Sequence, residues 1–85
     1  MNKTNINNKE KFDPETFQPF TKVLVRNRGI DIWTTALFTH INKSMEYPYR
    51  CMLNCFKYCI PYNDDTKNLL GTTDEAPEYY RYWEE

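Results

Sequence analysis

The apolar residues of this sequence fall in short runs that end at turn-forming residues, and this pattern constrains the fold more than any other feature. The clearest run is Lys22-Val23-Leu24-Val25-Arg26, which is rich in β-branched residues. Asn27-Arg28-Gly29 follows it directly, and Asn and Gly are favoured in tight turns. The run therefore predicts a β-strand over residues 22–26.

A second, longer run extends from Asp31 to Ile41 and places apolar side chains on both of its alternating faces. Such a pattern is typical of a long, bent strand that is covered on two sides in a small barrel. A helix over residues 34–39 is the competing interpretation. The three threonines in this segment disfavour a helix, because β-branched residues lose side-chain freedom there.

Two more strands are predicted over residues 47–51 and 55–60, with a turn at Leu53-Asn54 between them. The alternative is a helix that carries the cysteines at positions 51, 55 and 59 on one face. Pro48 and Pro61 stand at both ends of this region, and proline interrupts helices, so the strands are favoured.

Together with a last short strand at Leu69-Leu70, these runs predict a mainly β fold, a small five-stranded SH3-like barrel over residues 12–74. Residues 1–11 are mostly polar and are expected to form a disordered, flexible leader. Residues 75–85 are expected to form an acidic, aromatic tail. The predicted core consists of Val23, Val25, Leu37, Phe38, Phe56, Ile60 and Leu70.

The tail is too aromatic for an indifferent solvated segment, since Tyr79, Tyr80, Tyr82 and Trp83 lie within five positions. Four exposed rings would form a sticky apolar patch. We therefore expect the tail to dock. Its own domain and a neighbouring subunit of a homo-oligomer both stay open as the docking surface.

Charge and cysteine usage narrow the partners and the compartment. The net charge is −1, but residues 64–85 carry seven acidic and two basic residues. A mildly basic body with an acidic tail argues against duplex DNA as a partner, because duplex binding needs a clear basic footprint. No segment is apolar and long enough for a signal peptide or a membrane span, and the number of cysteines, three, is odd. We expect a cytoplasmic protein with reduced thiols and no membrane partner.

Four motifs stand out along the chain. They are Lys22-Val23-Leu24-Val25-Arg26, Tyr47-Pro48-Tyr49-Arg50-Cys51, Cys59-Ile60-Pro61-Tyr62-Asn63 and Leu69-Leu70-Gly71-Thr72-Thr73. Together they resemble a family of small uncharacterised proteins from Bacteroides-type bacteria and their phages and mobile elements. The resemblance covers about residues 17–74 and departs at Leu53-Asn54, where the family pattern has glycines. It implies a phage or prophage setting, and it implies no reaction and no catalytic residues. The first motif is also similar to the first strand of many SH3-like barrels.

Basic and aromatic residues are interleaved along the predicted strands and form the candidate ligand-binding surface. The candidates are Arg26, Arg28, Trp33, Tyr49, Arg50, Lys57 and Tyr62. Arginine offers forked donors to phosphate, and aromatic rings offer stacking faces to bases. The competing explanation is a solvated sheet face whose aromatic pairs only stabilise the barrel.

Metal and thiol chemistry receive little support from the spacing. Cys51, Cys55, Cys59 and His40 would supply four zinc ligands, or a thiol and a base, but their spacing is not that of a zinc knuckle. The two glycines, Gly29 and Gly71, are too few for a phosphate-binding loop. We expect no catalytic residue, no metal and no cofactor.

The sequence thus predicts a non-enzymatic binding protein. In a phage or prophage setting, its target would be a host protein, or a nucleotide signal that it sequesters, as in an anti-defence protein. The alternative is a single-stranded nucleic-acid-binding module. A thiol or zinc enzyme is the third and most remote hypothesis.

Overall fold

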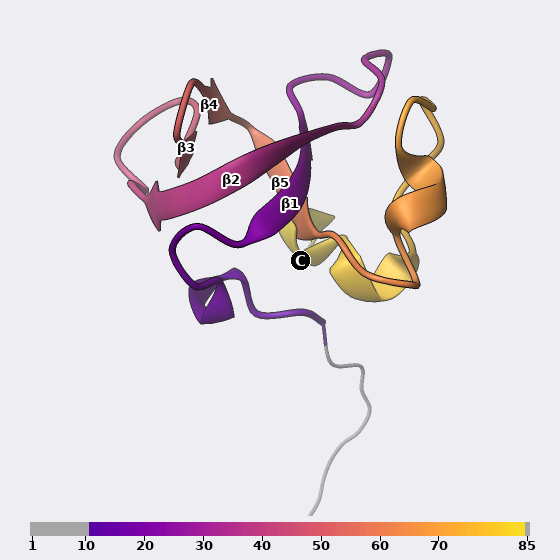
Figure 1. Ribbon diagram of the computed structural model, residues 1–85, viewed down its shortest axis with the longest axis horizontal. Helices are drawn as coiled ribbons and strands as arrows, with labels where there is room; N and C mark the ends of the chain where they lie inside the picture. Colours follow the sequence, from indigo (N-terminus) through magenta and orange to yellow (C-terminus); the bar gives the residue numbers. More distant parts are fainter. Residues whose placement is uncertain (1–10, 85) are drawn as a thin grey trace, which may run out of the picture.

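The computed structural model describes residues 11–84, and these residues form a mainly β structure (Figure 1). Its five-stranded antiparallel sheet has the order β4-β3-β2-β1-β5. The strands are β1 (Lys22–Arg26), β2 (Thr34–Ile41), β3 (Tyr49–Cys51), β4 (Cys55–Phe56) and β5 (Tyr58–Pro61). Short 3-10 helices accompany the sheet at η2 (Pro14–Thr16), η3 (Lys67–Leu69), η4 (Glu78–Tyr80) and η5 (Tyr82–Glu84).

The edges of the sheet are β4 and β5, although only Lys57 separates these strands in the chain. β1 lies between β2 and β5, and each of its residues after Lys22 is buried. No ladder joins β4 to β5 within residues 11–84, so the sheet is not closed. The mainly β, five-stranded prediction is confirmed, and the closed barrel is not.

The strands predicted over residues 22–26, 31–41 and 47–51 are present, although the second begins at Thr34 and the third at Tyr49. Both helical alternatives are excluded, since residues 34–39 and the three cysteines lie on strands. The predicted strand over residues 55–60 is divided at Lys57 into β4 and β5.

The strand predicted at Leu69-Leu70 is wrong. Leu69 ends the 3-10 turn η3, and Leu70 forms a single parallel bridge with Trp33. Gly71 follows with φ 81°, a left-handed conformation that glycine adopts without strain. The turn ends the segment before a ladder can form, so the fifth strand of the sheet is the second half of the 55–60 run.

Two apolar clusters cover the two faces of β1, because successive side chains of a strand point to opposite faces. The first contains Leu24, Trp33, Ile60, Ala76 and Tyr80, and the second contains Val23, Val25, Phe38 and Cys59. The prediction that Leu37 and Leu70 are core residues is wrong, since 42% and 46% of their surfaces are exposed. Phe56 is half-buried against the second cluster. Burial is confirmed for Val23, Val25, Phe38 and Ile60.

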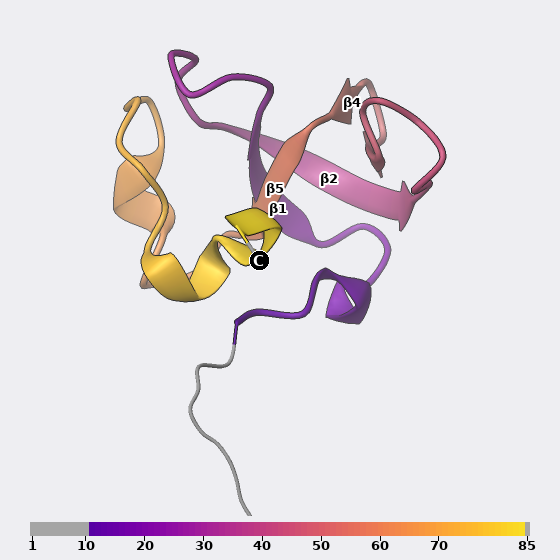
Figure 2. The same cartoon turned by 180° about the vertical axis from the view of Figure 1, so that it is seen from behind.

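The C-terminal segment lies against the first cluster, and Figure 2 shows its last turn, in yellow, in front of the end of β1 and β5. Tyr80 is buried, and the Tyr82 hydroxyl donates a 2.6 Å hydrogen bond to the carbonyl of Cys59 on β5. The N–H of Phe12 donates to the carbonyl of Tyr79 at 2.8 Å. The two ends of the described chain therefore lie side by side. Most of the predicted leader, residues 1–10, lies outside the described residues.

The helical segments of residues 11–84 are single turns. None has the length or the apolar composition that a helix needs to cross a bilayer. The compartment therefore stays a prediction.

Candidate functional site

Two of the seven candidate binding residues serve the interior of the fold. Trp33 has no exposed surface, and its indole N–H donates to the carbonyl of Asp74 at 2.8 Å. The Arg26 guanidinium stacks over the Trp33 ring at 4.3 Å and donates to the carbonyls of Gly29, Asp31 and Thr73. Trp33 is therefore a core residue, and Arg26 ties the β1–β2 connection to the C-terminal segment.

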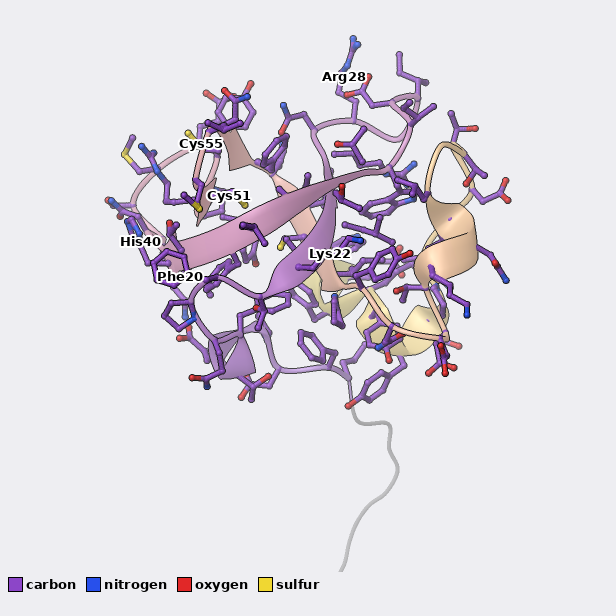
Figure 3. All side chains as sticks on the ribbon, in the orientation of Figure 1. Phe20, Lys22, Arg28, His40, Cys51 and Cys55 are labelled. Carbon is purple, nitrogen blue, oxygen red and sulfur yellow. The ribbon has the colours of Figure 1, made fainter. Side chains whose placement is uncertain are left out.

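Of the other three basic candidates, Arg28 and Lys57 are exposed and Arg50 is half-buried. Arg28 lies at the tip of the β1–β2 connection and pairs with Asp31 at 3.0 Å (Figure 3). Lys57 lies between β4 and β5, where its N–H donates to the side chain of Asn27 at 2.9 Å. Arg50 is the central residue of β3, opposite His40 on β2 and Cys55 on β4. Lys57 thus contacts Asn27, the residue before Arg28, and Arg50 pairs with a strand that ends one residue before Lys57.

The two remaining candidates are partly covered aromatic residues. Tyr49 packs on the second apolar cluster, with its ring 6.0 Å from that of Tyr82. Burial raises the pKa of the Tyr49 hydroxyl above its usual value. Tyr62 follows β5 and carries the ammonium of Lys22 over its ring at 4.3 Å. The seven candidates therefore do not form one exposed surface. Arg26 and Trp33 are buried, and Tyr49 and Tyr62 are half-buried.

Burial keeps the thiols of Cys51 and Cys59 protonated. Burial raises the pKa of Cys51 to about 11 and moves that of Cys59 further above its usual value. A thiol is a poor nucleophile and a poor metal ligand until it loses its proton. Within residues 11–84, no three side chains of the His, Cys, Asp or Glu type gather where they would hold a metal ion.

A groove of about 660 Å³ lies beside the first half of β2. One side is formed by β2 and Lys22 of β1, and the other by the β3–β4 hairpin. The lining residues are Lys22, Thr34, Thr35, Ala36, Leu37, Cys51, Met52, Leu53, Asn54 and Phe56. Lys22 and Cys51 mark its two sides in Figure 3. Lys22 is the one charged residue in the lining that the structure describes.

The rim of this groove exposes large apolar side chains. Leu53 is 92% exposed, Met52 is 58% exposed, and Leu37 of β2 is also open to solvent. Met52 and Leu53 form the tip of the β3–β4 hairpin, where the N–H of Cys51 donates to the carbonyl of Asn54 at 2.8 Å. Tight turns usually carry Gly, Asn, Asp or Ser. Two consecutive apolar residues are not needed to form such a turn, and their exposure means that they do not pack in the core.

The floor of the groove contains unpaired backbone groups of β2. The N–H and C=O groups of successive strand residues point to opposite sides. Phe38 bonds to Thr21 on the β1 side, whereas the carbonyl of Leu37 accepts from the N–H of Met52 on the β3 side. Thr35, two residues before Leu37, therefore also faces the β3 side.

β3 does not reach Thr35, since its pairing with β2 begins only at Phe38. At the other end, Trp33 donates to the carbonyl of Thr72 and accepts from the N–H of Gly71, both at 2.9 Å. Between these partners, no hydrogen bond within residues 11–84 reaches the N–H and C=O of Thr35 or the N–H of Leu37. The floor of the groove is thus a length of β2 that has no paired strand on its β3 side.

The sequence does not predict this site, because Leu37 is predicted to be a core residue and Leu53 to lie in a turn. A signal is present in Met52-Leu53, since two apolar residues stand directly before and at the start of the predicted turn Leu53-Asn54. The groove offers apolar contact and backbone hydrogen bonding, and its uncharged thiol offers no nucleophile.

Comparison of the chain with protein-family models, with curated proteins and with solved structures finds no match.

Proposed function

We propose that this chain is a non-enzymatic binding protein whose groove beside β2 receives a segment of a partner protein. The observation that supports it most directly is the cluster of exposed Leu37, Met52 and Leu53 around an apolar hollow of about 660 Å³. A contiguous exposed apolar surface around a hollow is typical of an interaction site. Removing it from water would contribute roughly 25 cal/mol per Å² of apolar area.

The resemblance to small proteins of Bacteroides-type bacteria and their phages supports a host protein as the partner. We propose that the chain acts on such a host protein in an anti-defence role, in the cytoplasm. Its three cysteines form no disulfide, which is the state expected in a reducing compartment.

We also propose that the sheet is an SH3-like barrel. The order β4-β3-β2-β1-β5 supports this classification, as does the presence of a single residue, Lys57, between the two edge strands. In this arrangement the groove lies beside the first half of β2, with which β3 does not pair.

The nucleotide-sequestering and single-stranded nucleic-acid hypotheses have less support. Both depend on accessible arginines and stacking rings. Arg26 is engaged by three carbonyl groups and Trp33 is fully buried. The thiol-enzyme hypothesis receives no support from Cys51 or Cys59, because burial raises the pKa values of both thiols.

Site-specific photo-crosslinking tests the proposed function. A benzophenone amino acid replaces Leu53 at the groove or, as the matched control, Ile30, which is 73% exposed on the β1–β2 connection outside the groove lining. In cells of a Bacteroides-type bacterium, the host that the resemblance implies, we expect irradiation to produce one discrete protein adduct from position 53 and none from position 30. Mass spectrometry identifies the adduct.

A second substitution defines the dependence on the groove. Leu37→Lys in the protein labelled at position 53 should abolish the adduct, because it places a charge in the apolar lining. Equal labelling from positions 30 and 53, or no adduct from either, would contradict the proposal.

A further inference from the structure

We infer that the partner segment binds in an extended conformation, as a short strand added to the unpaired edge of β2 at Thr35. This inference depends on the proposed function and specifies its binding mode. Peptide binding by strand addition obtains affinity from main-chain hydrogen bonds and specificity from alternate side chains.

The backbone groups of β2 match an extended ligand. Thr35 presents one N–H and one C=O to the groove, and Leu37 presents an N–H. One residue of a bound strand would exchange two hydrogen bonds with Thr35, as a hydrogen-bonded pair of an antiparallel ladder does. A bound helix satisfies its own backbone groups and would leave these three without protein partners.

The walls of the groove match the alternating side chains of such a strand. Thr35 and Leu37 are opposite Leu24 and Lys22 in the β1–β2 register and share their face of the sheet. Ala36 belongs with the opposite face, where Cys51 and Phe56 also pack on the second apolar cluster. Side chains on both sides of an added strand would therefore meet apolar surface, which favours β-branched or other apolar residues.

The free edge also limits the length of the ligand. It is bounded by Trp33, which is bonded to the segment after η3, and by Leu37, whose carbonyl is bonded to Met52. Strand residues rise about 3.3 Å each, so these positions are roughly 13 Å apart. About three to four residues of the partner would lie in the gap.

The charge around the groove identifies the ligand further. Lys22 is the charged residue of the described lining, and residues 20–57 carry six basic and two acidic residues in all. The acidic residues concentrate in residues 64–85. The occupant that fits is a partner segment in which apolar or β-branched residues alternate with, or adjoin, Asp or Glu. Residues 1–10 of this chain carry two lysines and one glutamate and match this chemistry poorly.

The test uses nine-residue peptides that are selected on the full-length protein from a displayed random library. We expect selected sequences to combine β-branched residues with Asp or Glu. Their fluorescein-labelled forms should lose binding in anisotropy measurements when Leu37→Lys is introduced. Ile30→Lys, the matched control outside the groove, should leave the affinity within about twofold, because surface charges at a distance are screened.

Backbone N-methylation of the peptide with the highest affinity tests the binding mode without altering the protein. Since alternate N–H groups of an added strand face β2, methylation at one set of alternate positions should weaken binding roughly tenfold or more. Methylation at the intervening positions should have little effect. In the same complex, hydrogen exchange at the Thr35 amide should slow at least tenfold, whereas the Ala36 amide, which already faces β1, should change little.

The outcomes separate the two proposals. Binding that depends on Leu37 but shows no alternation and no Thr35 protection would overturn strand addition and leave the proposed function intact. If neither Leu37→Lys nor Ile30→Lys changes the affinity of the selected peptides, the groove is not their binding site. That result would contradict both the proposed function and strand addition. Concentration-dependent dimerisation that Leu53→Asp abolishes would identify a second copy as the occupant and would overturn the acidic partner segment.

Discussion

Phe20 has a backbone conformation that its side chain disfavours. It has φ 68° and is 66% exposed, and it occupies the third position of a turn from Gln18 to Thr21 (labelled in Figure 3). Pro19 in the second position and a positive φ in the third are the features of a type II turn, which usually carries Gly at that position. The left-handed conformation costs a residue with a Cβ atom about 1–2 kcal/mol.

Phe20→Gly should therefore raise the free energy of unfolding by about 0.5–1 kcal/mol, since part of the relief is offset by the greater freedom of glycine in the unfolded chain. Urea denaturation measures the change. The control is Phe20→Ala, which removes the ring and keeps the strained conformation, so it should give no gain. A Gly variant no more stable than the Ala variant would contradict the assigned turn.

The cysteines differ in accessibility, and this difference makes a second prediction. Cys59 is fully buried, and the pKa of Cys51 is raised to about 11 by burial and by the neighbouring Cys55. Because the thiolate is the reactive form, iodoacetamide at pH 8 should leave Cys51 and Cys59 unmodified in the folded protein. In denaturant all three cysteines should react, as peptide mass spectrometry would show. Rapid modification of Cys51 in the folded state would instead favour the thiol-enzyme hypothesis.

At the scale of the elements, β1 and β2 show what the sequence predicts and where it fails. The Val-Leu-Val run identified β1 because a strand buried on both faces has a continuous apolar pattern. The same reasoning assigned Leu37 to the core, since its alternation matches that of a buried strand. Its exposure depends on where β3 ends, which is a property of another segment that local periodicity does not contain.

Trp33 is predicted to lie on a binding surface, but it is fully buried. Its placement beside Arg26 suggested a ligand-binding surface, but the pair is covered by residues about 40 positions later in the chain, including Asp74 and Ala76. Sequence patterns predict local structure, and contacts of this range are set by the chain path. The groove is not predicted for the same reason, because it forms where the β3–β4 hairpin no longer pairs with β2.

Substitutions on these two strands test the revised core. Val25→Ala should lower the free energy of unfolding by about 1–3 kcal/mol, because it leaves a cavity in a fully buried position. Leu37→Ala, which removes more carbon atoms from a partly exposed position, should cost less than about 1 kcal/mol. Both values come from urea denaturation. A larger loss for Leu37→Ala would place Leu37 in the core after all.

At the scale of the whole molecule, the C-terminal segment completes the fold. An 85-residue chain has a small core, and stability at this size is only a few kcal/mol. The aromatic residues of the segment add to that core. Tyr80 is buried in the first apolar cluster, and Trp83 lies 4.9 Å from the ring of Tyr58 on β5. Here the tail packs on its own chain, with Glu75, Glu78 and Glu84 exposed.

Tyr79 and Tyr80 form an adjacent pair that tests the role of the segment. The Tyr80 ring is 8% exposed, and its hydroxyl accepts from the Asn63 amide at 3.0 Å, whereas Tyr79 is 50% exposed. Tyr80→Ala should lower the free energy of unfolding by about 2–4 kcal/mol, since it removes a buried ring and leaves a polar partner unpaired. Tyr79→Ala should cost less than about 1 kcal/mol.

The same experiment distinguishes packing within one chain from packing between subunits. If Tyr80 packs on its own sheet, the loss should be independent of protein concentration, because the folding equilibrium then involves one molecule. Urea denaturation at two concentrations a hundredfold apart, with the elution volume on a sizing column, provides the measurement. A loss for Tyr80→Ala that grows on dilution, together with a shift from oligomer to monomer, would show that the ring docks on a neighbouring subunit. Equal, small losses for both tyrosines would show that the segment contributes little to the fold.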